Sequence, residues 1–220
     1  ARAAGLLLVG GPEANDPVGA STTGVGELID HALTAGATRI IVGLGGSATT
    51  DGGFGAVRAI PAPARLRRAD LVAACDVDTR FTDAARVFGP QKGATPTQVT
   101  LLTRRLERLA QLYQEEYGVD VRDLAGAGAA GGLAGGLAAL GARVTSGFDL
   151  VADEVDLFDH IAEADLVVTG EGHLDAQSFD GKVVGGVIEM AAEAGVPVLV
   201  ITGDADADVA DHPLVTSDVE

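Results

Sequence analysis

The chain has 220 residues, 47% of them hydrophobic, and a formal net charge of −17. This acidic balance argues against nucleic acid and membranes as partners, because phosphate backbones and anionic lipid surfaces are bound through clustered lysine and arginine. The single cysteine, Cys75, excludes a disulfide within the chain, and no apolar run is long enough to span a bilayer. We therefore expect a cytoplasmic protein with one large domain or two small lobes.

The sequence predicts strands that alternate with helices. Strands are expected where β-branched and apolar residues run together, and helices where N-cap residues precede an apolar stripe. In chain order, the prediction is a strand at 5–10, a helix at 23–36, a strand at 38–43, a linker at 61–68, a strand at 70–77, a loop at 79–93, helices at 95–118, 133–140 and 157–162, a strand at 165–169, a helix at 183–194 and a strand at 196–202.

Carboxylates follow three of the predicted strands. Asp51 follows the second strand, Asp76 and Asp78 lie at the end of the third, and Glu171 and Asp175 follow the fourth. Strands that alternate with helices pair in parallel, and ligands bind at the carboxyl ends of such strands. The sequence therefore predicts an α/β fold in which these carboxylates converge.

The most informative segment is GLGGSATTDGG, which follows the second strand. Its glycines let the backbone approach a ligand closely, and consecutive N–H groups there can hold an anion. Its aspartate is a candidate for binding Mg²⁺ or for accepting a substrate proton. The alternative is a tight strand-to-helix turn in which this aspartate acts as a cap. The candidate ligand-binding residues in this segment are Gly45, Gly46, Ser47, Thr49 and Asp51.

Two further loops carry charged candidates. Asp76 and Asp78 are paired carboxylates that suit a metal ion or a general base, or that simply form a turn. In FGPQKG, Lys92 is a cation on a Gly/Pro loop of a very acidic chain, which makes it a candidate phosphate partner. The alternative for Lys92 is a solvated loop lysine.

The segment GEGHLD places Glu171, His173 and Asp175 at alternating positions after a strand. If the chain stays extended, the three side chains point to a similar side and are candidates for binding a metal or a hydroxy acid. For His173 alone, a hydrogen-bonded loop histidine is the commoner case. Gln177 and Lys182 follow, the latter at the start of a predicted helix.

A second glycine-rich loop, GAGAAGG at residues 126–132, has no side-chain chemistry. It is suited either to wrapping a phosphate or nucleotide with backbone N–H groups or to close helix packing. The sequence leaves these two alternatives open.

Together these motifs resemble the type I glycerate kinases. The residues that carry the resemblance are GLGGSATTDGG, CDV at 75–77, VFGPQKGAT at 87–95, GAGAAGG, and DLVVTGEGHLD with Gln177, Gly181 and Lys182, all in the family's order. The resemblance implies a two-lobed α/β fold. Residues 1–60 and 150–203 would form a Rossmann- or flavodoxin-like parallel-sheet lobe, 61–149 a second α/β lobe, and 204–220 an acidic peripheral tail.

The resemblance also implies a kinase that transfers a phosphoryl group from ATP, with Mg²⁺, to a hydroxyl of glycerate or a similar hydroxy acid. The active site would lie in the cleft between the lobes, and the sequence leaves a homodimer open. The implied catalytic residues are Asp76, Asp175, Lys92 and Lys182, with Asp76 or Asp175 as the base; the implied metal ligands are Asp51 and Asp76; the implied substrate- and phosphate-binding residues are Gly45, Gly46, Ser47, Thr49, Asp51, Glu171, His173 and Gln177.

The chain departs from the family pattern in three places. Nothing here matches the strand and Asp-Ser-Phe-Lys-Gly-Ser segment with which the family usually opens, so the family's N-terminal segment is expected to be missing. His173 stands where the family usually has arginine, and a histidine binds a carboxylate less firmly than a bidentate arginine. The segments 59–68 and 81–87 are short. The first two departures favour an alternative function, a non-catalytic glycerate-kinase-like protein that binds a ligand or regulates a partner.

Overall fold

The computed structural model describes residues 3–179, 183–206 and 209, and it divides into two compact units. Unit 1 is Ala1–Thr145 and unit 2 is Ser146–Glu220. Both units combine helices with parallel strands, which confirms the predicted α/β class. Within the described ranges, no helix is both long enough and apolar enough to cross a membrane.

Unit 1 contains a sheet of three parallel strands in the order β1-β2-β3. The strands are β1 (Arg39–Gly43), β2 (Asp70–Ala74) and β3 (Arg143–Thr145). The central strand β2 is buried from its second residue onward, whereas β1 alternates between exposed and half-buried residues. All three strands point the same way, so their carboxyl ends share one edge of the sheet.

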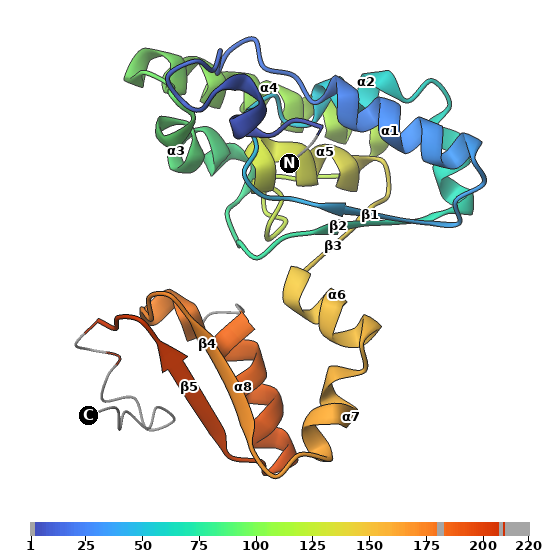
Figure 1. Cartoon of the computed structure of the whole chain (residues 1–220). Helices are drawn as coiled ribbons and strands as arrows, with labels where there is room; N and C mark the ends of the chain where they lie inside the picture. Colours follow the sequence, from blue (N-terminus) through green and yellow to red (C-terminus); the bar gives the residue numbers. More distant parts are fainter. Residues whose placement is uncertain (1–2, 180–182, 207–208, 210–220) are drawn as a thin grey trace. The chain divides into compact units, whose positions relative to one another are not determined.

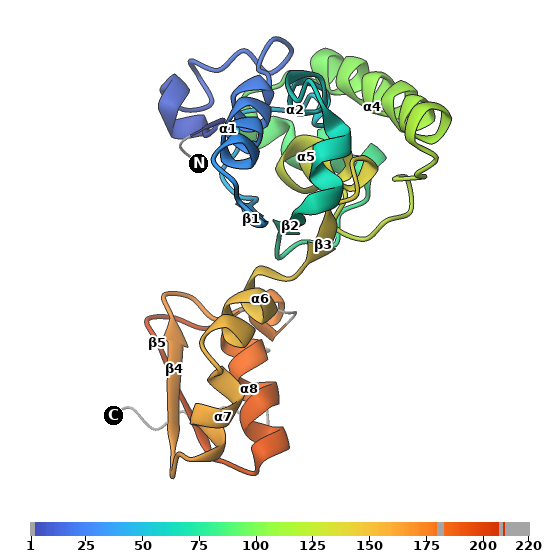
Figure 2. The same cartoon turned by 90° about the vertical axis from the view of Figure 1, so that its right-hand side faces the viewer.

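The helices of unit 1 cover one face of this sheet, as both views in Figures 1 and 2 show. Their bounds are α1 (Thr23–Thr34), α2 (Phe54–Ala59), α3 (Ala84–Phe88), α4 (Pro96–Tyr117) and α5 (Ala129–Ala139). The core beneath them includes Phe81, Leu102, Leu106 and Tyr113, each at most 1% exposed. Burial of these large side chains stabilises unit 1.

The longest helix, α4, begins and ends where its sequence predicts. Thr95 accepts a hydrogen bond from the Gln98 amide and the Gln98 side chain accepts one from the Thr95 amide, so the two form a capping box. Pro96 occupies the first turn, and Gly118 takes the left-handed conformation just after the last residue.

Three stretches of unit 1 differ from the prediction. Residues 5–10 are not a strand, because Leu6–Val9 form the 3₁₀ helix η1 and Gly10 closes it in the left-handed conformation. The predicted linker at 61–68 contains the 3₁₀ helix η2 (Pro63–Arg68), which buries Leu66 in the core. The predicted loop at 79–93 instead holds three short helices, namely η3 (Phe81–Asp83), α3 and η4 (Pro90–Lys92).

Unit 2 pairs two parallel strands, and its helices lie on one side of them (Figures 1 and 2). The elements are α6 (Gly147–Glu154), α7 (Leu157–Ala162), β4 (Val167–Glu171), the 3₁₀ helix η5 (Ala176–Phe179), α8 (Val183–Ala194) and β5 (Val198–Thr202). A small core forms around Leu174, Val184, Ile188 and Val200. After β5, the backbone of residues 204–206 pairs with Leu174, so this part of the predicted tail is held by unit 2.

The predicted lobes divide the chain differently from these units. The sheet of unit 1 pairs residues 39–43 with 70–74, on either side of the predicted boundary near residue 60. The predicted grouping of 1–60 with 150–203 concerns an association between the two units, and it stays a prediction.

Candidate functional site

A cavity of about 390 Å³ lies at the carboxyl ends of β1 and β2. Its walls come from five segments of unit 1: η1, the loop after β1, the turn after β2, the stretch from the end of α3 to η4, and the start of α5. The lining residues are Leu6, Leu44, Gly45, Gly46, Ser47, Val77, Phe88, Gln91, Lys92, Ala129 and Ala130. The motifs GLGGSATTDGG, FGPQKG and GAGAAGG therefore meet at one cavity, as expected for a ligand site at the strand ends of an α/β sheet.

Three consecutive backbone amides in this cavity wall have no acceptor in the part of the chain that the structure describes. Among the described residues, none accepts a hydrogen bond from the N–H groups of Gly45, Gly46 and Ser47. The amides on either side, of Leu44 and Ala48, do donate to backbone carbonyls at 2.9 and 2.8 Å. Gly46 has a φ of 59°, a conformation that glycine adopts without strain. A run of unpaired N–H groups fixed at both ends is suited to binding an anion.

Lys92 is buried against the same loop. Its Nζ donates hydrogen bonds to Ser47 Oγ at 2.8 Å and to the Thr49 carbonyl at 2.7 Å. The residue is only 3% exposed, and burial lowers the pKa of Lys92 to about 8, against an opposing effect of the Asp51 carboxylate. Lys92 is therefore not a solvated loop lysine but a buried cation next to the unpaired amides.

Asn15, which the sequence did not single out, ties the lysine loop to the glycine-rich loop. Its Nδ2 donates to the Lys92 carbonyl at 2.9 Å and to the Ala48 carbonyl at 3.0 Å. The backbone also packs tightly here, because a Cβ at Gly93 would clash with the Pro12 carbonyl. No local pattern marks Asn15, since its partner Lys92 is 77 residues away in sequence.

The Asp51 carboxylate closes the glycine-rich loop. Oδ2 accepts hydrogen bonds from Thr22 N and Thr22 Oγ1, both at 2.8 Å, and from Gly55 N at 3.1 Å. Oδ1 accepts one from Gly53 N at 3.1 Å. Asp51 thus has the capping role that the sequence offered as an alternative, and with four donors around it few acceptor positions remain. Metal binding by Asp51 stays a prediction.

The second glycine-rich loop mainly serves close packing. Gly131 and Gly132 have φ values of 70° and 89°, and a Cβ on Gly131 would clash with the Thr49 carbonyl. A Cβ on Gly132 would lie 2.8 Å from Gly52 Cα. Of the two alternatives for GAGAAGG, the structure shows the packing role, and this packing holds the loop of residues 49–52 in place.

Other predicted site residues of unit 1 differ in how exposed they are. Thr49 is 2% exposed and its hydroxyl has no partner among the described residues, so it lies behind the loop and not on its surface. Asp76 and Asp78 are exposed just after β2, on either side of Val77, which lines the cavity. In the described part of the chain, no three His, Cys, Asp or Glu side chains are grouped so that they could hold a metal ion.

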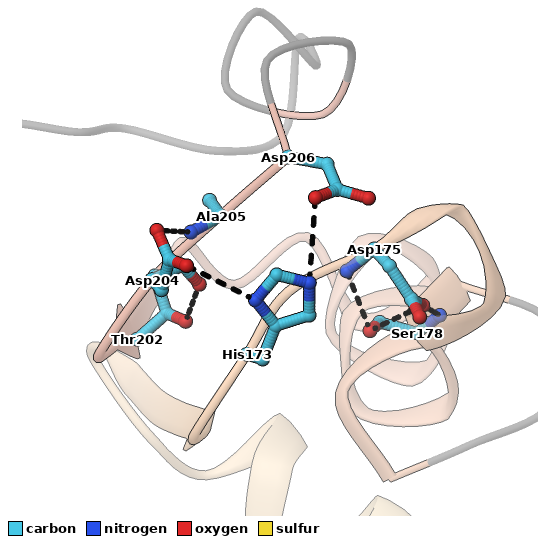
Figure 3. A network of polar contacts seen from close by, with 7 residues as sticks. All are labelled: His173, Asp175, Ser178, Thr202, Asp204, Ala205 and Asp206. Carbon is cyan, nitrogen blue, oxygen red and sulfur yellow. Dashed lines mark hydrogen bonds and ion pairs between the residues drawn. The ribbon is translucent and has the colours of Figure 1, made fainter.

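In unit 2, the GEGHLD residues contact different partners, as Figure 3 shows. The ring of His173 lies between two carboxylates, with Nδ1 3.4 Å from Asp204 Oδ2 and Nε2 3.4 Å from Asp206 Oδ1 (Figure 3). Asp175 instead caps η5, where its Oδ1 accepts hydrogen bonds from the Ser178 amide at 2.9 Å and the Ser178 hydroxyl at 3.2 Å (Figure 3).

Glu171 ends β4, and its Oε1 is buried without a hydrogen-bond partner among the described residues. The predicted common orientation of Glu171, His173 and Asp175 requires an extended chain, whereas the chain bends after β4 and enters η5. Lys182 lies outside the described residues, as does the side chain of Gln177.

Comparisons with known proteins give a consistent result. The model of the family described as "Glycerate kinase family" matches residues 1–64 and 61–216. The chain is 39% identical to the glycerate 2-kinase of Escherichia coli, covering 95% of this chain and 63% of that protein. It is 43% identical to an uncharacterized protein of Mycobacterium bovis, covering 94% of this chain and 57% of that protein.

A solved structure agrees with these relatives. The crystal structure of a Salmonella typhimurium LT2 protein assigned as glycerate kinase 2 superposes with a TM-score of 0.78 at 41% identity, covering 91% of this chain and 62% of that chain. The chain thus spans about three fifths of the length of the curated relatives it matches, between 57% and 63%.

Proposed function

We propose that this chain, which belongs to the glycerate kinase family, carries a phosphate-binding part of a site that transfers a phosphoryl group from ATP to glycerate. Family membership and the names of relatives such as the Escherichia coli glycerate 2-kinase support this reaction. The name of that relative also favours transfer to the 2-hydroxyl, with 2-phosphoglycerate as the product.

The observation that carries the proposal is the run of unpaired amides at Gly45, Gly46 and Ser47 beside the buried Lys92. In a chain with a net charge of −17, a polyanion such as ATP can bind only where local donors outweigh the general repulsion. Backbone N–H groups supply such donors without a counter-charge, and Lys92 adds a positive charge in a poorly hydrated place. Phosphate oxygens fit this donor set.

The chemistry requires positioning and charge stabilisation more than covalent catalysis by the protein. The loop amides and Lys92 would hold phosphate oxygens and stabilise the negative charge that grows on them during transfer. Asp76 or Asp175 would accept the proton of the glycerate hydroxyl. Asp76, which is exposed just after β2, would hold Mg²⁺, and the ion would offset negative charge on the phosphates when bound; the oxygens of Asp51 already accept four hydrogen bonds.

Glycerate binding by His173 would have to displace contacts that the ring already makes. Asp204 and Asp206 already lie within 3.4 Å of the two ring nitrogens, so a substrate carboxylate would compete with them. The same observation favours the second candidate function, a ligand-binding member of the family without turnover. Lys182, Glu171 and Gln177 remain proposed contributors on the family resemblance alone.

The test is an assay of the complete gene product that contains this chain, with ATP, Mg²⁺ and D-glycerate. Enolase, which acts on 2-phosphoglycerate, detects the proposed product directly, and ADP release measures turnover independently. We expect glycerate-dependent ADP release and an enolase-reactive product. ADP release without an enolase-reactive product would show that another hydroxyl of glycerate is phosphorylated. If no ADP is released in response to glycerate, the kinase proposal is wrong and the ligand-binding function is favoured.

A matched pair of variants tests the role of the cavity. Lys92→Met removes the buried cation and keeps a side chain of similar length, whereas Arg122→Met removes an exposed cation of the same unit. We expect the first to lower kcat/KM at least about a hundredfold and the second to leave it within about twofold, since one charge-assisted phosphate contact contributes about 3 kcal/mol in a desolvated site. Equal activity of the two variants would remove Lys92 from the mechanism.

A further inference from the structure

A second cavity of unit 1, of about 460 Å³, lies against α4 and shares no residue with the cavity at Lys92. Three arginines of one helical segment line it, Arg104, Arg105 and Arg108. The rest of the wall is largely apolar and includes Phe54 and Leu109. The wall of this cavity thus combines three cations with apolar side chains, in a chain whose net charge is −17.

The three cavity arginines differ in their partners from six other arginines of unit 1, whereas Arg58, Arg67 and Arg68 likewise form no ion pair with a described carboxylate. Six arginines each lie within ion-pair distance of an aspartate: Arg39, Arg65, Arg80, Arg86, Arg122 and Arg143. By contrast, no described carboxylate forms an ion pair with any of the three cavity arginines. Available aspartates and glutamates outnumber cations about twofold in this chain, 32 against 15, so unpaired arginines are not explained by a shortage of carboxylates.

The hydrogen bonds of these arginines leave most of their donors unused. Arg105 donates to the Val18 carbonyl at 3.0 Å, and Arg108 donates to Gln111 Oε1 at 2.9 Å. Arg104 has no hydrogen bond to a described residue, although a guanidinium carries five N–H donors. Arg104 and Arg108 are also four residues apart on one helix, a spacing at which like charges destabilise the helix. An anion between them would remove this repulsion.

The one carboxylate in the wall, Asp51, does not serve as the counter-ion. Its two oxygens accept hydrogen bonds from Thr22, Gly53 and Gly55 and form no ion pair with an arginine of this cavity. A neighbouring cavity shares Val18, Asp51 and Phe54 and is lined by a further arginine, Arg58.

The guanidinium of Arg58 stacks over the Phe54 ring at 5.6 Å from its centroid. Phe54 therefore lines both of these cavities. It is 36% exposed, so its ring is open to contact with a bound molecule.

We propose that the α4 cavity binds a small organic anion, with a phosphate or carboxylate held by Arg104 and Arg108 and an apolar or aromatic body against Phe54 and Leu109. Guanidinium groups bind both kinds of anion in a bidentate manner, so the shared chemistry is a planar pair of anionic oxygens on an apolar body. This site is separate from the proposed phosphoryl-transfer site and does not depend on it.

The test uses four probes of graded chemistry, measured by isothermal titration calorimetry on the full chain. Phenyl phosphate and benzoate carry the two anionic groups on the same ring, phenol lacks the charge, and inorganic phosphate lacks the ring. We expect phenyl phosphate, benzoate or both to bind at least about tenfold more tightly than phenol and than inorganic phosphate. The stronger of the two aromatic anions identifies the preferred head group.

Three variants locate the binding. The double variant Arg104→Ala with Arg108→Ala should weaken the bound aromatic anion at least tenfold. The charge-matched control Arg67→Ala with Arg68→Ala, on the exposed surface of η2, should leave its affinity within twofold, as should Lys92→Met. Loss of α4 folding would not explain a weakened affinity, because alanine favours the helix and the like-charge pair is removed; an unchanged or higher unfolding midpoint checks this.

The proposal is overturned by any of three results. Neither aromatic anion binds the unmodified chain more tightly than phenol does. Alternatively, the Arg104/Arg108 double variant binds as the unmodified chain does. Finally, Lys92→Met abolishes the binding, which would place the anion in the cavity at the end of β1.

Discussion

At the scale of single residues, the buried Lys92 links stability to pH. Its pKa is about 8 in the folded chain, against an ordinary value of 10.5. Between these two values the unfolded chain binds more protons at this residue than the folded chain does, so the stability of the folded chain rises with pH. Below pH 8 both states are protonated, and the full cost of burying the charge is present.

We therefore predict a pH-dependent difference between the unmodified chain and Lys92→Met. From pH 7.5 to pH 9.0, Lys92 alone should raise the free energy of unfolding by about 1 kcal/mol, and this rise should be absent in the variant. Urea unfolding followed by tyrosine fluorescence measures it for unit 1, because the chain has no Trp and its two tyrosines, Tyr113 and Tyr117, both lie in α4. If the free energy of unfolding changes with pH in the same way in both proteins, the lowered pKa of Lys92 is contradicted.

Asp51 gives a second prediction at this scale. Asp51→Asn replaces one of two accepting oxygens with an NH₂ group that faces donors, so we expect a loss of about 3 kcal/mol in the stability of unit 1. Asp78→Asn, at an exposed carboxylate, should change stability by less than about 0.5 kcal/mol. If Asp51 only caps the loop, the Mg²⁺ concentration for half-maximal activity of the folded variant stays unchanged. A large increase in that concentration, without a loss of stability, would instead make Asp51 a metal ligand.

At the scale of elements, the packing of α5 against the glycine-rich loop predicts a contrast between two glycines. Gly131 and Gly141 both have left-handed φ values, 70° and 94°. A Cβ at Gly131 clashes with the Thr49 carbonyl, whereas a Cβ at Gly141 meets nothing within 4 Å. Gly141→Ala should cost only the backbone strain, about 1 kcal/mol, and Gly131→Ala at least about 3 kcal/mol. Urea unfolding measures both, and equal losses would show that the clash is relieved by movement of the loop.

Element by element, the sequence predicted the long and strongly marked segments well. The helix α4 has a capping box, a proline in its first turn and a closing glycine, and its bounds agree with the prediction. The strands β1 and β2 were predictable because β-branched and apolar residues run together there. By contrast, the apolar run of Leu6–Val9 contains little to distinguish a strand from a tight helical turn, and Leu7 proves to be 91% exposed.

The candidate site was predictable in part. The motifs that line the cavity at Lys92 could be found because glycines and one of the chain's two lysines stand out in an acidic, aliphatic sequence. The role of Asn15 could not, because it depends on a contact with a residue 77 positions away, and for Asp51 the sequence offered a cap as an alternative but not the contact with Thr22, 29 positions away. The expected alignment of His173 with Asp175 failed because a bend and η5 follow β4, and the Asp175 carboxylate caps η5 by accepting hydrogen bonds from Ser178.

At the scale of the whole molecule, the net charge of −17 implies self-repulsion that salt should relieve. The Debye length falls from about 10 Å at 0.1 M to about 3 Å at 1 M ionic strength. We expect the thermal unfolding midpoint to rise by a few degrees over this range, on the order of what a 1 kcal/mol gain produces. KCl and NaCl should act alike, because the effect is general screening. A fall in the midpoint would contradict the prediction, and a rise with only one of the two salts would indicate a specific ion site.

The amides of Gly45, Gly46 and Ser47, which have no acceptor among the described residues, also allow ligand binding at the loop after β1 to be followed by hydrogen exchange. An amide without an acceptor exchanges its hydrogen with solvent nearly as fast as an unfolded chain does, whereas the neighbouring amides of Leu44 and Ala48 are bonded and exchange slowly. Native-state deuterium labelling of this chain should therefore show three fast sites between two slow ones. A ligand that fills the cavity would slow those three sites together, and one that binds at α4 would leave them fast.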